Sequence, residues 1–235
     1  MEKVSGSLPS AISEALAGLP EWLLERPGKV FYSGKSAFVN AKRSSLYILG
    51  LNPGGSPVSE SEETVGRSLT SFYEREDDWS SYTESWKSKP PGQYGMQPRV
   101  QHLLKALGRS PTSTPSSNVV FVRTARAKDL QEEKRALLDA CWPVHEAVIT
   151  SLQVKVIICF GAEAGAWVRQ KLGARKTDAF DSFRETYDKR NWLSQSYRAP
   201  DGRIIVQVSH PSIADWTAPH ADPSDLVRRA IEAAS

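Results

Sequence analysis

The sequence has few of the residues that build metal and disulfide sites. Two cysteines and four histidines occur among 235 residues, without a CxxC or an HExxH pair. Two thiolates are too few for an iron–sulfur cluster or for a structural zinc site with four cysteine ligands. Cys141 and Cys159 both lie in apolar stretches, LLDACWPV and VIICFG, so we expect buried, reduced thiols and no metal site.

Signatures of several enzyme and membrane classes are also missing. The motifs GxGxxG, GxxxxGK[ST] and GxSxG do not occur, which argues against common dinucleotide, nucleoside triphosphate and α/β-hydrolase sites. No apolar run approaches the ~20 residues of a membrane helix. The first residues, MEKVSGSLPSAISEALAGLPEW, lack the apolar core of a signal peptide. We therefore expect a cytoplasmic protein with no membrane partner and no cofactor.

The composition is that of an ordinary globular protein. Hydrophobic residues make up 40% and charged residues 24%, and this length suits one α/β domain better than two. We expect a single domain over 1–235, with a helical cap at 1–43 and an insertion loop at 55–93. The net charge of +3 and the pI near 8.8 are compatible with a nucleic-acid partner but do not indicate one alone.

Four short apolar runs predict buried strands. They lie at residues 45–51, 118–122, 154–160 and 204–208. Helical patterns at about 98–107, 131–152, 162–172 and 223–234 separate or follow them, and residues 10–25 predict one or two short helices before the first strand. Residues 55–93 show no sustained periodicity, and 174–202 are polar and mixed. This order predicts an α/β fold, a three-layer α/β/α arrangement with a central four-stranded parallel sheet.

Ligands of such sheets bind in the crevice beyond the carboxyl ends of the strands. In the segment GLNPGG, Pro53 fixes its own φ and biases Asn52 towards an extended backbone, so the carboxamide can project from the strand end. A neutral amide there can hold a water molecule without adding charge. Gly54 and Gly55 allow close approach of a ligand to the backbone. Alone, this segment is also an ordinary turn sequence.

A second unusual segment, SHPS, follows the last apolar run. An imidazole at a strand end, as in His210, can donate a hydrogen bond to a developing oxyanion. Ser209 and Ser212 offer hydroxyls and backbone amides for a phosphate. A single histidine in this place is more often structural. The pairing with Asn52 changes that balance, because both residues terminate predicted parallel strands at the same edge of the sheet.

Together these segments resemble the uracil-DNA glycosylase superfamily. GLNPG at 50–54, VVFVRTARAKDL at 119–130, VIICFGAEAGAWV at 156–168 and HPS at 210–212 are similar to its motifs, in the family's order. The resemblance spans about residues 45–215. It implies a monomeric, monofunctional DNA glycosylase that flips a base out of DNA and hydrolyses its N-glycosidic bond, leaving an abasic site. Uracil or a modified pyrimidine is the expected base, and DNA the expected partner.

The resemblance also implies roles for individual residues. Asn52 positions the attacking water, and His210 stabilises charge on the departing base. Base or substrate contacts are expected from Gly50, Leu51, Pro53, Gly54, Tyr94 and Thr124. DNA contacts are expected from Gly55, Ser56, Arg123, Arg126, Ser209, Ser212 and Ile213. For Tyr94 core packing is an equal alternative to stacking on the base, and the residue that fills the gap left by the flipped base is either Ile213 or Trp216.

Two features depart from the family pattern. Thr124 stands where uracil-specific branches carry an asparagine, so strict uracil selectivity is not expected. The insertion at 55–93 is long, which suits a larger modified base and leaves both DNA repair and defence against phage open as biological roles. The alternatives are a catalytically weak or inactive DNA-binding member of the same fold, an unrelated α/β enzyme acting on a nucleotide or sugar phosphate, and an interaction module built on the tryptophan-rich insertion.

Overall fold

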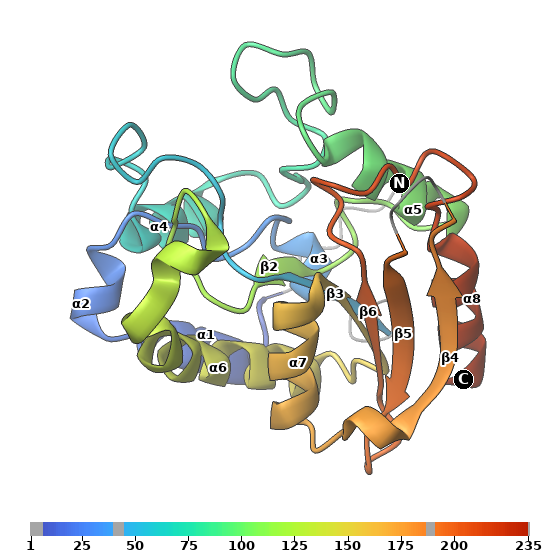
Figure 1. Cartoon of the computed structure of the whole chain (residues 1–235). Coiled ribbons are helices and arrows are strands. Elements are labelled where there is room, and N and C mark those ends of the chain that lie inside the picture. The colour runs from blue at the N-terminus through green and yellow to red at the C-terminus, as the bar shows by residue number, and fades with distance from the viewer. Residues whose placement is uncertain (1–6, 40–44, 187–190, 235) are drawn as a thin grey trace.

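The computed structural model describes residues 7–39, 45–186 and 191–234. Its centre is a mixed six-stranded sheet with strand order β2-β1-β3-β6-β5-β4 (Figure 1). The first four strands of that order run parallel, whereas β5 is antiparallel to both β6 and β4. The strands are β1 (Leu46–Gly50), β2 (Ser116–Asn118), β3 (Val156–Phe160), β4 (Ala179–Arg184), β5 (Leu193–Arg198) and β6 (Ile204–Val208).

Helices cover both faces of this sheet (Figure 1). The α-helices are α1 (Ser10–Ala17), α2 (Glu21–Leu24), α3 (Ser36–Val39), α4 (Val65–Glu74), α5 (Gln97–Ala106), α6 (Lys134–Ser151), α7 (Ala162–Lys171) and α8 (Ser224–Ala233). Two 3₁₀ segments accompany them, η1 (Ala127–Glu133) and η2 (Lys176–Asp178). The helices predicted near 10–25, 98–107, 131–152, 162–172 and 223–234 are confirmed. No helix of the described residues is long and apolar enough to cross a membrane.

Alternation along the strands divides the interior into two cores. Tyr47 and Leu49 of β1 pack with the side chains of α1, α6 and α7. Leu46 and Ile48 point to the opposite face, where they pack with α5 and α8. Every residue of β1 and β3 is buried because both faces are covered, which explains the continuous apolar runs in the sequence. Cys141 and Cys159 are buried and free, as predicted.

The sheet differs from the four-stranded parallel one that the sequence predicts. Residues 174–202 contain two further strands, β4 and β5, which form an antiparallel hairpin and add to β6. The burial pattern of β4 alternates between half-buried and exposed residues. Such an edge strand needs no apolar run, so the polar composition hid it.

Two other segments also differ from prediction. Strand β2 ends at Asn118 instead of residue 122, although Val119–Val122 are fully or almost fully buried. The amides of Val119 and Val120 still donate to the Gly50 and Leu51 carbonyls, and the run then meets residues 28–29 through the Gly28–Val122 bridge and the Lys29 amide on the Phe121 carbonyl. The insertion at 55–93 contains a regular helix, α4, whose first turn is capped by the Thr64 hydroxyl.

Candidate functional site

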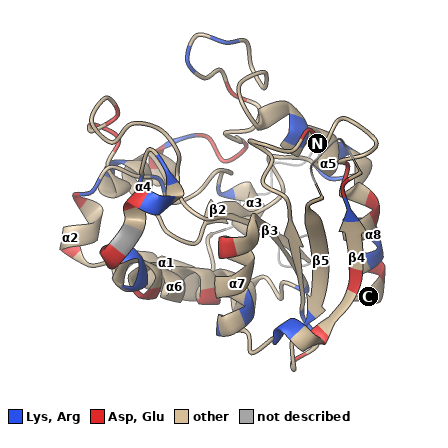
Figure 2. Ribbon diagram, viewed as in Figure 1, with Lys and Arg blue, Asp and Glu red and all other residues tan. Residues whose placement is uncertain are grey.

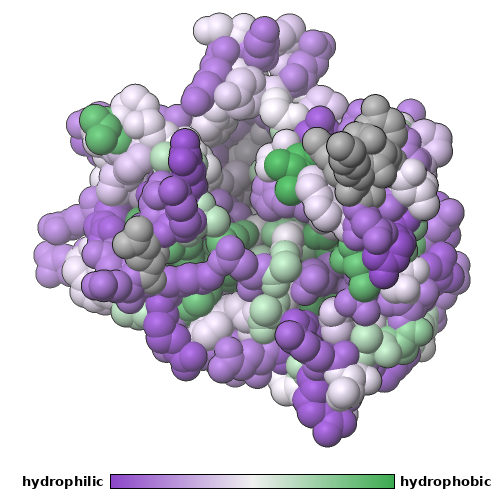
Figure 3. Space-filling view, viewed as in Figure 1, coloured by the Kyte–Doolittle hydropathy of each residue, from purple (hydrophilic) through white to green (hydrophobic). Residues whose placement is uncertain are grey.

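A cavity of about 690 Å³ lies at the carboxyl ends of the parallel strands. Figure 3 shows this face hollowed beneath the loop of residues 81–96 that precedes α5, which we call the projecting loop. Residues that follow β1, β2, β3 and β6 all contribute to it. Of the residues predicted to form a site, those that line it are Gly50, Leu51, Asn52, Gly54, Gly55, Tyr94, Arg123, Thr124, Arg126, His210, Ser212 and Ile213. The cavity therefore brings the two predicted catalytic side chains to one hollow.

The Asn52 carboxamide is held in one orientation. Its Nδ2 donates to the Thr124 Oγ1 at 2.8 Å, the Pro53 carbonyl at 3.1 Å and the Val122 carbonyl at 3.3 Å. Carbonyl oxygens only accept, so a flipped amide would place Oδ1 against them. Among the described residues no donor is bonded to Asn52 Oδ1, which leaves this oxygen available to accept a hydrogen bond from a water molecule.

The Thr124 side chain helps to hold the Asn52 carboxamide in its orientation. Its hydroxyl donates to the Arg126 carbonyl at 2.9 Å and accepts from Asn52 Nδ2. The single hydroxyl proton is therefore used inside the protein. Thr124 lines the cavity, but the geometry gives its hydroxyl a positioning role towards Asn52, whereas the sequence predicted a contact with the base.

His210 presents a neutral imidazole with a defined tautomer. The backbone amide of Ser212 donates to His210 Nδ1 at 3.1 Å, and the Ser212 Oγ lies 2.7 Å from the same atom. Because an amide can only donate, Nδ1 is the acceptor and the proton of the neutral ring sits on Nε2. Burial lowers the pKa of His210 to about 4. At neutral pH the residue thus offers an uncharged Nε2–H donor.

Phe160 and Gly161 support this imidazole from the end of β3. The Phe160 ring contacts the His210 ring edge to face, with centroids 6.2 Å apart. Gly161 has a φ of 89°, a region that favours glycine, and the position of its absent Cβ lies 3.7 Å from the His210 Cδ2. The turn into α7 therefore passes beside the imidazole.

Asn118 is a site residue that the sequence reasoning missed. It is the last residue of β2, is only 6% exposed and lines the cavity beside Gly50. A Cβ at Gly50 would lie 2.1 Å from the Asn118 Oδ1, so any side chain at position 50 would displace the Asn118 carboxamide. Burial raises the pKa of Tyr32 to about 12, while its hydrogen bond with the Asn118 side chain opposes that rise. A buried carboxamide facing a cavity is a specific donor and acceptor for a planar polar ligand.

The predicted phosphate contact of Arg123 needs correction. Its side chain is 1% exposed and forms ion pairs with Glu60 and, at 2.7 Å, with Glu63. It also donates to the Gly54 carbonyl at 2.6 Å. Arg123 therefore anchors the loop that follows Asn52, and its charge is already neutralised by carboxylates.

Three other predicted residues do not line the cavity. Pro53 is buried, and its carbonyl accepts from Asn52 and from the Thr124 amide. Ser56 closes a turn by accepting from the Ser59 amide. The Ser209 amide donates to the Ser194 Oγ at 3.1 Å, and its own hydroxyl oxygen is buried. The predicted DNA contact of Ser209 is therefore wrong for this arrangement, because neither polar group of that residue is presented outward.

The rim of the cavity carries exposed residues of both apolar and basic type. Ile213 is 53% exposed and Tyr94 is 36% exposed, and both line the opening. Trp216 is fully buried against Phe160, with ring centroids 5.3 Å apart. Of the two candidates for a residue inserted into DNA, only Ile213 is exposed. Arg126 is exposed and also lines the cavity, and Figure 2 shows basic residues on the projecting loop.

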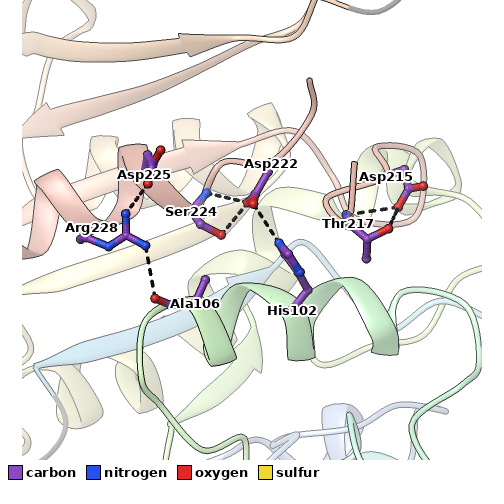
Figure 4. A network of polar contacts seen from close by, with 8 residues as sticks. All are labelled: His102, Ala106, Asp215, Thr217, Asp222, Ser224, Asp225 and Arg228. Atoms are coloured by element: carbon purple, nitrogen blue, oxygen red, sulfur yellow. Dashed lines mark hydrogen bonds and ion pairs between the residues drawn. The ribbon is translucent and has the colours of Figure 1, made fainter. Parts of the chain in front are cut away.

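Helix α5 fixes the loop that contains His210. Arg99 donates to the Pro211 carbonyl at 2.6 Å and lies 3.5 Å from the Asp215 carboxylate. One turn further on, His102 Nε2 lies 2.8 Å from Asp222, which also accepts from Ser224 at the start of α8 (Figure 4). These contacts join α5 to both ends of the segment between β6 and α8, so the loop is tied down at two points.

Comparison with known proteins does not place the chain in a family. No protein-family model matches the sequence, and no characterised protein matches it closely enough to count as a relative. Within the described part of the chain, no group of three or more histidine, cysteine, aspartate or glutamate side chains is arranged to hold a metal ion. Function must therefore be inferred from the geometry of the cavity and from the motifs.

Proposed function

We propose that the protein is a monofunctional DNA glycosylase of the uracil-DNA glycosylase type, acting on a flipped pyrimidine. The observation that carries this proposal is the meeting of Asn52 and His210 in one cavity at the carboxyl ends of β1 and β6. One offers a fixed amide oxygen and the other a neutral N–H donor. These are the two groups that hydrolysis of an N-glycosidic bond requires at opposite ends of the breaking bond.

The reaction begins with extrusion of the nucleotide, because a stacked base shields its glycosidic bond. The C1′–N bond then breaks, and its electron pair leaves with the base. His210 Nε2–H donates a hydrogen bond to the resulting base anion, a type of interaction worth about 10²- to 10³-fold in rate. Asn52 Oδ1 holds the water whose oxygen bonds to C1′, and the proton lost from that water balances the charge of the released base. The products are a free base and an intact abasic site.

Asn118 supplies the recognition of the base in this proposal. Its carboxamide lies at the end of β2, next to the end of β1 where Asn52 begins the motif loop. A carboxamide presents a donor and an acceptor side by side, which matches the edge of a pyrimidine. The role that the sequence assigned to Thr124 is thus better filled by Asn118.

DNA contacts are assigned to the exposed rim. Ile213 fills the space left by the flipped base, and Tyr94 stacks at the mouth of the cavity. Arg126 contacts the phosphate backbone, together with the lysines of the projecting loop, Lys87 and Lys89. Added salt screens the attraction between exposed cationic side chains and phosphates. The affinity for DNA is therefore expected to fall as the ionic strength rises from low to moderate.

The test is single-turnover cleavage of synthetic duplexes that carry uracil or a modified pyrimidine, followed by alkali to reveal abasic sites. Asn52→Ala and His210→Ala are each expected to slow base release at least tenfold. Gln170→Ala, an exposed amide on α7, is the matched control and should leave the rate unchanged. Circular dichroism verifies that each variant is folded. If no duplex is cleaved while DNA is still bound, the protein is a DNA-binding member of the fold without activity.

A further inference from the structure

The wall of the cavity continues beyond Asn118, away from His210. The Tyr32 amide donates to the Ser116 carbonyl at 2.9 Å, and the Ser81 amide donates to the Tyr32 carbonyl at 2.8 Å. Bridges between Phe31 and Ser117 and between Ser33 and Ser80 complete this pairing. The segments around residues 32 and 81 therefore extend the sheet past β2. They place the insertion directly beside the position of the base.

Four residues form what we call the side compartment: Tyr32, Ser81, Tyr82 and Trp86, all of which line the cavity. The rings of Tyr32 and Tyr82 are stacked with centroids 6.0 Å apart. Burial raises the pKa of both phenols, that of Tyr32 to about 12, so both rings are neutral. Flat, uncharged aromatic surface of this kind favours stacking of a ring-shaped ligand group.

Ser81 provides a polar group without a partner in this compartment. The residue is 6% exposed, and among the described residues its Oγ has no hydrogen-bond partner. A buried hydroxyl without a partner is destabilising, because it has lost its hydrogen bonds to water. Its Oγ is buried in this rotamer, but Ser81 lines the cavity, so rotation about χ1 would bring the hydroxyl to a hydroxyl or ether oxygen of a ligand.

The side compartment is preformed. Gln97 Nε2 donates to the carbonyls of Ser81 and Glu84 at 2.6 and 2.9 Å. Gln101 Nε2 donates to the carbonyls of Tyr82 and Gly92 at 2.8 and 2.9 Å. Two glutamines of α5 thus hold both ends of the projecting loop by hydrogen bonds to its carbonyl groups. A rigid pocket of this kind binds without an ordering penalty.

The carboxylate near the side compartment is already paired: Glu60 forms an ion pair with Arg123 and lies 3.6 Å from Lys87. The ammonium group of Lys29 lies 5.2 and 5.7 Å from the ring centroids of Tyr32 and Trp86, and burial lowers its pKa to about 8. Lys29 does not line the cavity. The four residues that form the side compartment are themselves uncharged, which suits a neutral ligand group.

The volume of the cavity also indicates a ligand group larger than a pyrimidine ring. The volume of about 690 Å³ lies within the range of about 300–1,000 Å³ that is usual for drug-sized ligands. A single pyrimidine ring occupies a small part of such a space. We propose that the side compartment takes a bulky, uncharged, hydroxyl-bearing substituent of the excised pyrimidine, such as a hexose attached through a hydroxymethyl group. This inference rests on the proposed glycosylase function.

The experiment compares four duplexes of identical sequence, which carry deoxyuridine, 5-methylcytosine, 5-hydroxymethylcytosine or glucosylated 5-hydroxymethylcytosine at one position. Base release is measured under single-turnover conditions with the full chain. The glucosylated base is expected to be released at least tenfold faster than 5-hydroxymethylcytosine. Ser81→Ala and Trp86→Ala are each expected to lower that ratio at least fivefold, whereas Trp22→Ala, an exposed tryptophan on α2, leaves it unchanged.

The outcomes separate this inference from the proposed function. If the unsubstituted bases are released as fast as the glucosylated one, and Asn52→Ala abolishes release, the protein is a glycosylase and the side compartment has no substrate role. A uniform loss of rate for all bases in Ser81→Ala, with the ratio preserved, assigns Ser81 a structural role and overturns the inference. Failure to release any base overturns the proposed function and the inference together.

Discussion

The Thr124 hydroxyl offers a sharp test of how the site is organised. It accepts the shortest of the three hydrogen bonds from Asn52 Nδ2, at 2.8 Å, and donates to the Arg126 carbonyl at 2.9 Å. Thr124→Val has nearly the same shape but can form neither bond. Thr124→Ser keeps the hydroxyl. The pair of variants therefore isolates the effect of one oxygen atom on the orientation of Asn52.

The size of the effect follows from the remaining contacts. In Thr124→Val, Asn52 Nδ2 retains the Pro53 and Val122 carbonyls at 3.1 and 3.3 Å, so the carboxamide is loosened and not released. One hydrogen bond contributes about 0.5–1.5 kcal/mol net. At 1.36 kcal/mol per factor of ten, the chemical step should slow by about 2- to 13-fold. Thr124→Ser should recover most of that loss.

The assay is single-turnover base release at saturating enzyme, with DNA affinity measured separately by fluorescence anisotropy. A positioning role predicts a lower maximal rate, an unchanged dissociation constant and the same factor for every base tested. A base-reading role predicts a change in the order of preference among bases. If Thr124→Val alters that order, or if Thr124→Ser is as slow as Thr124→Val, the positioning account is wrong.

Four further predictions concern pH, stability and selectivity. Because burial lowers the pKa of His210 to about 4, base release should not decline as pH falls from 7.5 to 5.5; a loss of rate centred near pH 6.5 contradicts a neutral donor. Burial also lowers the pKa of His145 to about 3, so below pH 6.5 the unfolded chain binds a proton that the folded chain does not. In urea unfolding, the free energy of unfolding should therefore fall by about 1.4 kcal/mol for each pH unit by which the pH is lowered below 6.5. His145→Phe should remove this contribution to the slope. Arg123→Met should lower the unfolding free energy by about 3–5 kcal/mol, because Glu60 is left poorly solvated with only its longer contact to Lys87; an effect below about 1 kcal/mol contradicts that pairing. Asn118→Ala should reduce the rate ratio between preferred and other bases at least about fivefold; an unchanged ratio, even with a lower rate, refutes a base-reading role for it.

The parts of the fold that the sequence predicted are those in which burial alone sets the composition. Strands β1, β3 and β6 are covered by helices on both faces, and their apolar runs follow directly. The hairpin β4–β5 lies at the sheet edge with few buried side chains, and its sequence carries no comparable signal. Helix α4 was missed for a similar reason, since only Val65 and Phe72 among its residues are buried.

The same logic explains why the sequence selected Thr124 where we now propose Asn118 as the base-reading residue. The run 118–122 is apolar because Val119–Val122 pack in the core, and burial marked it as a strand. The regular strand pairing ends at Asn118 instead: Val119 and Val120 still donate to the Gly50 and Leu51 carbonyls, and Phe121 and Val122 then pair with residues 28–29. A strand end read from apolar residues fell four positions late and selected Thr124 instead of Asn118. In a parallel sheet the ligand site lies where the regular hydrogen bonding between strands ends. An asparagine within an apolar run, such as Asn118, is the sequence signal for the end of the strand.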